Sequence, residues 1–288
     1  MARLSTRYIA GEQRSDALKR GAQLARAGYR VTYDQLGEAV SNEAEVALAV
    51  AENQQLLADL IAGDLELNIS TKPTQMGINI SEDLCHDSLA EMLETATANN
   101  AFVRFEMEES WTVDATLRVF ERLRATYGKT VGVVVQSMLF RTEEDLHKML
   151  ASSEQPLNVR LVKGIYVEPA EIAFQDYQEV NDSYMRCLRL LLEGGAYVGV
   201  ATHDDHLVAG LQELLAENPA WTEQCEIQML LGVREDLRMK VRASGLPVRV
   251  YVPYGDAWHK YVTRRLKKNP KLARYAFLGM FKRGEKLS

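Results

Sequence analysis

The sequence contains few of the residues from which disulfide frameworks and metal centres are built. Its three cysteines, Cys85, Cys187 and Cys225, lie far apart and form no CxxC pair. This excludes a secreted disulfide scaffold and predicts free thiols in a reducing compartment. The five histidines include no HxH or HExxH spacing, and the one cluster, HDDH at residues 203–206, has a poor ligand pattern. No metal site is therefore predicted.

Long apolar runs are also missing. No segment approaches the ~20 apolar residues that span a bilayer, so no transmembrane segment is predicted. The N-terminal stretch MARLSTRYIAGEQR lacks the apolar centre of a secretory signal. A cytoplasmic protein is the expectation. Glycine and proline, with 18 and 7 residues, are too scarce for a collagen-like or linker-rich chain.

The net charge is −6, from 34 basic and 40 acidic residues, which argues against a dedicated nucleic-acid binder. The charge is unevenly spread, because residues 260–288 carry ten Lys and Arg but a single acidic residue, Glu285. A basic segment on an acidic body suits contact with an anionic ligand or a membrane surface. The alternative is a C-terminal helix docked on the body with its lysines in water, since apolar residues from Leu272 to Met280 follow helical spacing.

Short β-branched segments alternate along the chain with longer amphipathic ones. Eight strands are predicted, at Tyr29–Tyr33, Glu66–Thr71, Phe102–Met107, Val131–Ser137, Asn158–Lys163, Tyr197–His203, Glu226–Leu231 and Val248–Val252. The helical stretches between them include Asn42–Ala62, Ser81–Asn99, Trp111–Tyr127 and Thr142–Ala151. Strand–helix alternation implies parallel pairing, because each return to the sheet needs a crossover.

Eight βα units in 288 residues predict a single α/β domain, a distorted (βα)8 TIM-type barrel over residues 1–288. An open doubly wound sheet is the alternative, but no GxGxxG follows the first strand. Residues 1–28 are expected to form a short N-terminal helical segment, and residues 256–288 a C-terminal helical segment. Ser81, Ser110 and Thr142 are predicted helix N-caps.

In such barrels the active site lies at the C-terminal ends of the strands. Polar residues gather at six or more of these ends, among them Lys72, Glu106, Gln136, Arg160, Lys163, Thr202, His203 and Gln228. Strand alternation places Arg160 and Val162 on one face, and Leu161 and Lys163 on the other. Lys72 and Glu106, on neighbouring strands, are expected to form an ion pair. A lone lysine or histidine there is often structural, so the functional prediction rests on the whole group.

The stretch after the last strand carries aromatic residues and arginines on one helical face. Trp258, Tyr261, Arg264 and Arg265 fall at i, i+3, i+6 and i+7. Arginine binds a carboxylate or phosphate through two parallel hydrogen bonds, which suits recognition of an anion. The alternative is a solvated or salt-bridged helix face.

Several blocks, in one order along nearly the whole chain, resemble the proline dehydrogenase family. They include RLVKGIYVEP, VATH, VYVPYGDAWHKYVTRRL, TKPTQMGINIS, FVRFEMEES and EIQMLLGV. The resemblance implies a distorted barrel holding FAD that oxidises L-proline to Δ1-pyrroline-5-carboxylate, the first step of proline catabolism to glutamate. It also implies that the reduced flavin passes electrons to a membrane quinone. Peripheral contact with the inner membrane is one route to that acceptor.

The resemblance also assigns roles to individual residues. The flavin-contacting positions are matched by Gln136, Arg160, Val162, Lys163, Gly164, Thr202, His203 and Gln228. The catalytic and proline-pocket positions are matched by Lys72, Glu106, Tyr166, Leu230 and Tyr251. Arg264 and Arg265 match the pair that binds the proline carboxylate, and Glu38 matches a carboxylate that pairs with this arginine region and gates the site.

The sequence departs from the family pattern at three positions. Glu106 stands where the family usually has Asp, Ile165 replaces the usual Ala, and Lys268 stands where Glu often follows the arginines. The helical segment that usually precedes RYIAGE is nearly absent, and the sequence includes no aldehyde dehydrogenase domain. The expectation is a minimal catalytic barrel of the monofunctional branch.

Two other functions stay open on the residues alone. One is a barrel lyase that forms a Schiff base through Lys163 or Lys72. The other is a non-catalytic binding barrel, in which the charged residues at the strand ends only pair with one another. A flavoprotein is yellow, whereas both alternatives are colourless, so a visible spectrum separates the flavoprotein from the two alternatives.

Overall fold

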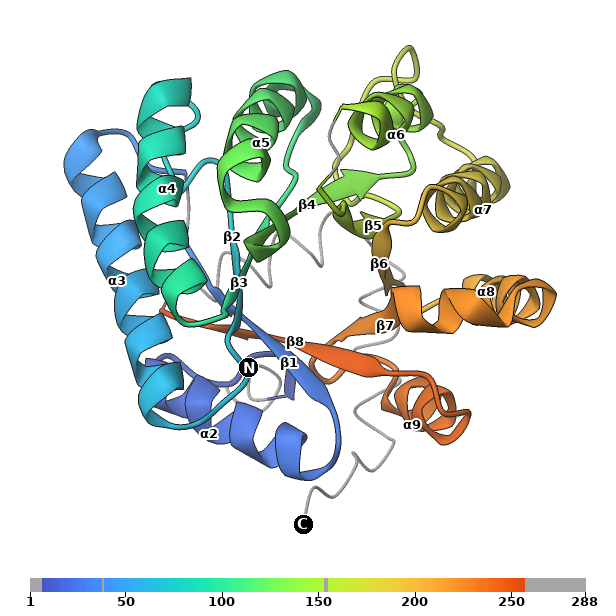
Figure 1. Ribbon diagram of the computed structural model, residues 1–288, viewed down its shortest axis with the longest axis horizontal. Coiled ribbons are helices and arrows are strands. Elements are labelled where there is room, and N and C mark those ends of the chain that lie inside the picture. The colour runs from blue at the N-terminus through green and yellow to red at the C-terminus, as the bar shows by residue number, and fades with distance from the viewer. Residues whose placement is uncertain (1–6, 38, 153–154, 257–288) are drawn as a thin grey trace.

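The computed structural model describes residues 7–37, 39–152 and 155–256, which form a closed barrel of eight parallel strands (Figure 1). The strands are β1 (Arg30–Gln35), β2 (Asn68–Thr71), β3 (Phe102–Phe105), β4 (Val131–Gln136), β5 (Asn158–Val162), β6 (Tyr197–Ala201), β7 (Cys225–Leu230) and β8 (Val248–Tyr254). They pair in chain order, and β8 closes onto β1. The predicted (βα)8 barrel is confirmed, with every strand end within two residues of its prediction.

Helices surround the barrel on its outer side (Figure 1). They are α2 (Arg14–Arg26), α3 (Glu43–Ala62), α4 (Glu82–Ala98), α5 (Val113–Tyr127), α6 (Thr142–Ala151), α7 (Tyr177–Glu193), α8 (Asp205–Glu217) and α9 (Glu235–Ala243). Short 3-10 helices are η1 (Ser110–Thr112), η2 (Gly128–Thr130) and η3 (Pro219–Gln224). The four helical stretches predicted between residues 42 and 151 correspond to α3, α4, α5 and α6.

One of the three predicted N-caps is confirmed. The Ser81 hydroxyl accepts hydrogen bonds from the backbone N–H groups of Asp83 and Leu84 at the start of α4. The prediction is wrong for Ser110, whose hydroxyl instead donates to Glu168 while η1 leads into α5. It is also wrong for Thr142, which lies inside α6 and donates its hydroxyl to the Gln136 carbonyl. The Ser110 hydroxyl is used by a tertiary contact, and the Thr142 hydroxyl by the end of β4 six residues earlier.

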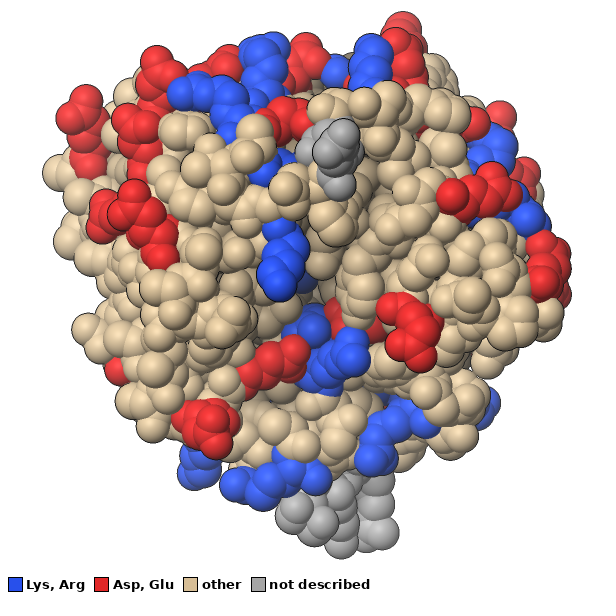
Figure 2. Space-filling view, viewed as in Figure 1, with Lys and Arg blue, Asp and Glu red and all other residues tan. Residues whose placement is uncertain are grey.

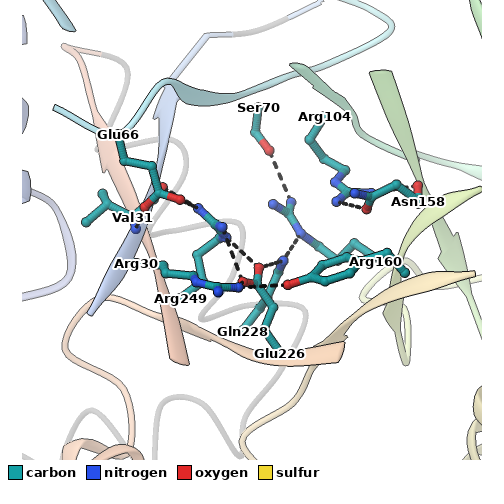
Figure 3. A network of polar contacts seen from close by, with 11 residues as sticks. Arg30, Val31, Glu66, Ser70, Arg104, Asn158, Arg160, Glu226, Gln228 and Arg249 are labelled. Carbon is teal, nitrogen blue, oxygen red and sulfur yellow. Dashed lines mark hydrogen bonds and ion pairs between the residues drawn. The ribbon is translucent and has the colours of Figure 1, made fainter. Parts of the chain in front are cut away.

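Alternation along the strands separates an apolar outer face from a polar inner one. Val103 and Phe105 of β3 and Leu161 of β5 are completely buried between the strands and the helices. The inward side chains of the same strands include Arg104 and Arg160, which are buried inside the barrel. The barrel interior is therefore a hydrogen-bonded charged network (Figure 3) rather than a purely apolar core.

The surface carries charges of both signs. On the face drawn in Figure 2, basic and acidic side chains are interspersed, and a hollow near its centre contains both. In the described residues, none of the helices has the length and apolar composition that a membrane crossing requires. Nor does that part of the chain place three or more His, Cys, Asp or Glu side chains where they could hold a metal ion. Cys85, Cys187 and Cys225 are buried free thiols.

Some predicted features lie outside the described residues. These are Glu38, Arg264 and Arg265, the aromatic face with Trp258 and Tyr261, and nearly all of the segment 256–288. They stay predictions. Helix α2 lies within the N-terminal segment 1–28 and packs against β1 and β8.

Candidate active site

The barrel opens at the C-terminal ends of its strands. On several strands, an inward side chain is buried, and the next inward side chain, two residues later, is half-exposed. The buried members are Ser70, Arg104, Arg160, Gln228 and Arg249, and their half-exposed successors are Lys72, Glu106, Val162, Leu230 and Tyr251. The second set lines a mouth where a ligand can reach the ends of β2, β3, β5, β7 and β8.

Arg160 occupies the centre of this mouth. Its Nε donates to Gln228 Oε1 at 2.5 Å, and its Nη1 donates to Ser70 Oγ at 3.1 Å and to Glu106 Oε1 at 2.5 Å. The guanidinium carbon also lies 5.1 Å from the centre of the Tyr251 ring. Four inward strands thus fix one guanidinium, and Figure 3 shows Ser70 and Gln228 reaching it from opposite sides.

The expected direct ion pair between Lys72 and Glu106 is not what the structure has. Lys72 Nζ donates to Asp34 Oδ1 at 2.7 Å, while Glu106 pairs with Arg160. Asp34 lies on the inward face of β1 and is completely buried. Each carboxylate therefore has its own cation. Asp34 binds the Lys72 ammonium, and Glu106 binds the Arg160 guanidinium.

The charges in the mouth shift one another's pKa values. Burial opposes the charge of Lys72, but the Asp34 carboxylate, with Glu106 and Glu108 beyond it, raises the pKa of the ammonium. Burial likewise opposes ionisation of Glu106, yet the Arg160 guanidinium and Lys72 hold the pKa of Glu106 below its ordinary value. Burial raises the pKa of Asp34. The four groups together form two ion pairs with no net charge.

Gln136 lies at the β4 end of the mouth, where a hydrogen bond from its side-chain amide to the backbone of Glu108 holds it. Its Nε2 donates to the Glu108 carbonyl at 2.8 Å, while the Glu108 carboxylate accepts hydrogen bonds from the backbone N–H and hydroxyl of Thr74. Burial raises the pKa of Glu108. Gln136 therefore has a fixed orientation beside β3.

Thr202 and His203 follow β6 and organise the two loops beside it. The Thr202 hydroxyl accepts a hydrogen bond from the backbone N–H of Asp204, and His203 Nε2 accepts one from the backbone N–H of Leu230 at 2.9 Å. Because this nitrogen accepts, the neutral ring carries its proton on Nδ1. His203 thereby sets the position of Leu230, one of the predicted pocket residues.

Lys163 lies apart from the inward group. Its Nζ donates to Asp204 Oδ2 at 2.5 Å and lies 4.3 Å from the centre of the Tyr177 ring, whose hydroxyl also bonds Asp204. Alternation places it opposite Arg160, as predicted. Gly164 then adopts φ +105°, a conformation that favours glycine, where the chain leaves β5 toward the half-exposed Tyr166.

Sequence reasoning missed Asp34, Ser70 as a partner of Arg160, and Glu226. The first predicted strand ends at Tyr33, one residue before Asp34, but β1 continues to Gln35. The missed signal was alternation, since a strand extended to Gln35 places Asp34 on the inward face with Thr32. The sequence predicts Glu226 only as the first residue of a strand, whereas the structure buries it inside the barrel at 1% exposure.

Comparison with known proteins identifies the family of this barrel. The sequence profile of the family described as proline dehydrogenase matches residues 17–274. This chain belongs to the proline dehydrogenase family. It is 34% identical over 278 residues to proline dehydrogenase 2 of Bacillus subtilis, covering 96% of this chain and 90% of that protein. It is also 32% identical over 286 residues to proline dehydrogenase of Deinococcus radiodurans, covering 98% and 91%.

The barrel also resembles a solved structure of a much longer protein. Proline utilization A from Bdellovibrio bacteriovorus, inactivated by N-propargylglycine, superposes with a TM-score of 0.87 at 24% identity. The match covers 99% of this chain but 34% of the other, so the chain spans about a third of it. This likeness supports the barrel fold that family membership already implies.

Proposed function

We propose that this chain is an FAD-dependent proline dehydrogenase that oxidises L-proline to Δ1-pyrroline-5-carboxylate and passes the electrons to a quinone. The observation that carries the proposal is the inward group around Arg160, where hydrogen-bonded donors lie beside half-exposed apolar and aromatic side chains. The chain's membership of the proline dehydrogenase family supports it. The reaction removes a hydride from the ring carbon next to nitrogen and a proton from that nitrogen. It is the first step of proline catabolism to glutamate.

The donor set suits a flavin. An isoalloxazine edge presents several hydrogen-bond acceptors, and within the described residues Arg160 uses only Nε and Nη1 for its hydrogen bonds, which leaves Nη2 for a ligand. The residues that would hold FAD are Gln136, Arg160, Val162, Lys163, Gly164, Thr202, His203 and Gln228. When bound, FAD supplies the acceptor for the hydride, and the protein supplies position and electrostatics.

The substrate side of the mouth follows from its charge. Asp34, Lys72, Glu106 and Arg160 cancel one another as two ion pairs, so the proline carboxylate needs a further cation. We assign that role to Arg264 and Arg265 and the gating role to Glu38, with Lys72 at the edge of the pocket. Tyr166, Leu230 and Tyr251 would pack on the ring and orient it.

The electron acceptor follows from the chemistry of a reduced flavin and from the charge distribution. The basic segment 260–288 suits contact with an anionic membrane surface, where a quinone is reached. A cytoplasmic enzyme that touches the inner membrane peripherally is therefore part of the proposal.

The Schiff-base lyase is disfavoured by a specific observation. A lysine that attacks a carbonyl needs a lowered pKa, but the Asp34 carboxylate raises the pKa of Lys72. Lys163 is likewise engaged by Asp204 and Tyr177. Both lysines are held as ion-paired ammonium groups, and a protonated amine is not a nucleophile.

A visible spectrum of the purified protein tests the proposal. The protein should be yellow or take up added FAD, and L-proline should bleach the flavin bands under anaerobic conditions. Addition of a soluble quinone should restore the bands. A protein that stays colourless after incubation with FAD, or a bound flavin that L-proline leaves oxidised, would refute the proposed activity.

A further inference from the structure

Below the mouth, a buried carboxylate connects the floor of the barrel to Arg160. Glu226 of β7 is 1% exposed, and its Oε1 accepts hydrogen bonds from Arg249 Nε at 2.5 Å and from Gln228 Nε2 at 2.7 Å. Its Oε2 accepts from Arg30 Nη1 at 2.9 Å and Arg249 Nη2 at 3.2 Å. Figure 3 shows this group beneath Arg160, with Gln228 between them.

The contacts leave Gln228 one orientation of its amide. Arg160 Nε can only donate, so Gln228 must present Oε1 to it. The Gln228 Nε2 group then points to Glu226, whose ionised carboxylate can only accept. A reversed amide would set two donors against each other at Arg160 and two acceptors at Glu226. Arg160 and ionised Glu226 therefore select the same orientation of the Gln228 amide.

The neighbouring strand leaves the space that this arrangement needs. A Cβ on Gly199 of β6 would lie 2.4 Å from Gln228 Nε2, so any larger residue would displace the amide. Arg249 forms two hydrogen bonds with Glu226 and is itself held by Glu66 Oε1 at 2.7 Å and by the Val31 carbonyl. Glu226 is thus fixed from below and has its upper contact with Gln228.

We propose that Glu226 is a positioning residue for the flavin site: it orients the Gln228 amide, which fixes the plane of the Arg160 guanidinium and directs Nη2 into the mouth. This inference rests on the proposed function, because it assigns the ordered guanidinium to FAD. Glu226 itself is predicted to contact neither cofactor nor substrate. Without Gln228, Arg160 would keep its Nη1 bonds to Glu106 and Ser70 but would lose the bond at Nε that holds the other side of the guanidinium.

Two variants break the link in different ways. Glu226→Met combined with Arg249→Met removes the carboxylate together with its main buried partner, a replacement that buried ion pairs often tolerate. Gly199→Ala leaves every charge in place but pushes the Gln228 amide away. Glu66→Gln is the matched control, because Glu66 also binds Arg249 but makes no contact with Gln228.

The first measurement is FAD affinity of the apoprotein, from flavin fluorescence, together with kcat and KM for proline. Loss of one hydrogen bond to a charged group predicts an FAD Kd raised about tenfold in both test variants. We expect kcat to fall while the proline KM stays near wild type, because the carboxylate contacts are elsewhere. Glu66→Gln should match wild type in all three values. Wild-type Kd and kcat in the folded test variants would overturn the proposal.

The second measurement needs no cofactor. In the apoprotein, the side-chain NH2 signals of Gln228, assigned by NMR through Gln228→Glu, should exchange slowly with solvent in wild type and Glu66→Gln. They should exchange rapidly or broaden in Gly199→Ala. If Gln228 stays protected in Gly199→Ala, the proposed orientation is wrong. If wild type binds no FAD while Gln228 is protected in wild type and loses that protection in the folded Glu226→Met/Arg249→Met variant, the proposed function fails and the orientation by Glu226 stands.

Discussion

Asp34 shows how one buried side chain sets the charge state of the mouth. It is completely buried on β1 and is the hydrogen-bonded partner of Lys72, a role that the sequence predicts for Glu106. Removing one partner of a buried ion pair leaves an uncompensated charge. The pKa of Lys72 should therefore depend more on Asp34 than on any other carboxylate nearby.

Replacing Asp34 with Asn keeps the side-chain size but removes the charge that raises the pKa of Lys72. That pKa should fall, so protonated Lys72 is lost at a lower pH than in wild type. The basic limb of the kcat/KM profile for proline should move to lower pH accordingly. Glu108→Gln is the control, because Glu108 contributes least to the pKa of Lys72 among the named carboxylates and should move the limb less. An unmoved limb in Asp34→Asn would contradict this assignment.

Glu106 acts through a different partner, and its variants should separate charge from length. Glu106→Asp keeps a carboxylate that a small movement of Arg160 can reach, so the variant should remain active. Glu106→Ala leaves Arg160 without its anion, and breaking such a buried pair costs about 3–5 kcal/mol. We expect a large loss of kcat/KM in the alanine variant, compared after flavin content has been measured in each. Equal activity of the two variants would remove the carboxylate from the mechanism.

At the scale of a single element, α4 begins at a cap that local sequence predicts and the structure confirms. Ser81→Ala removes the acceptor for the Asp83 and Leu84 N–H groups. It should lower the free energy of unfolding by about 1 kcal/mol in a urea titration. Ser81→Asn keeps a capping oxygen and should stay near wild type. A stable Ser81→Ala variant would mean that the α3 and α5 contacts alone hold the start of α4.

At the scale of the whole molecule, the charged floor should make stability depend on pH. Although burial opposes ionisation, Arg249 and Arg30 lower the pKa of Glu226 to about 2, against an ordinary 4.5. A lowered carboxylate pKa stabilises the folded state above about pH 4.5, and this contribution, roughly 3 kcal/mol, is lost as the pH falls toward 2. Burial of the side chain means that solvent does little to screen this effect.

Urea unfolding between pH 7 and pH 3 measures this contribution. Glu226→Gln should be less stable than wild type at pH 7, but its stability should fall less steeply as the pH is lowered. Glu144→Gln is the control, since Glu144 forms an exposed i,i+4 pair with Lys148 and should leave the wild-type slope nearly unchanged. Parallel slopes for wild type and Glu226→Gln would show that the barrel floor does not titrate as described.

The sequence by itself determined the fold through short-range patterns. Strand ends such as Asn158 and helix starts such as Ser81 follow from alternation, β-branched composition and capping, which act over a few residues. Eight repeats of that pattern leave few topologies, because parallel strands joined by helices need right-handed crossovers. Alternation alone also places Arg160 and Lys163 on opposite faces of β5.

Only the tertiary structure decided which charges meet. Arg160 reaches Glu106, 54 residues away, and Arg249 reaches Glu66, 183 residues away, across the inside of a closed barrel. Those pairings depend on the strand register and on which neighbours leave room, as Gly199 does for Gln228. Sequence period gives the face of a side chain, but several acids and bases share that inner face. Their partners are chosen by distances that the strand register sets, and so Lys72 binds Asp34 across the β1–β2 pair.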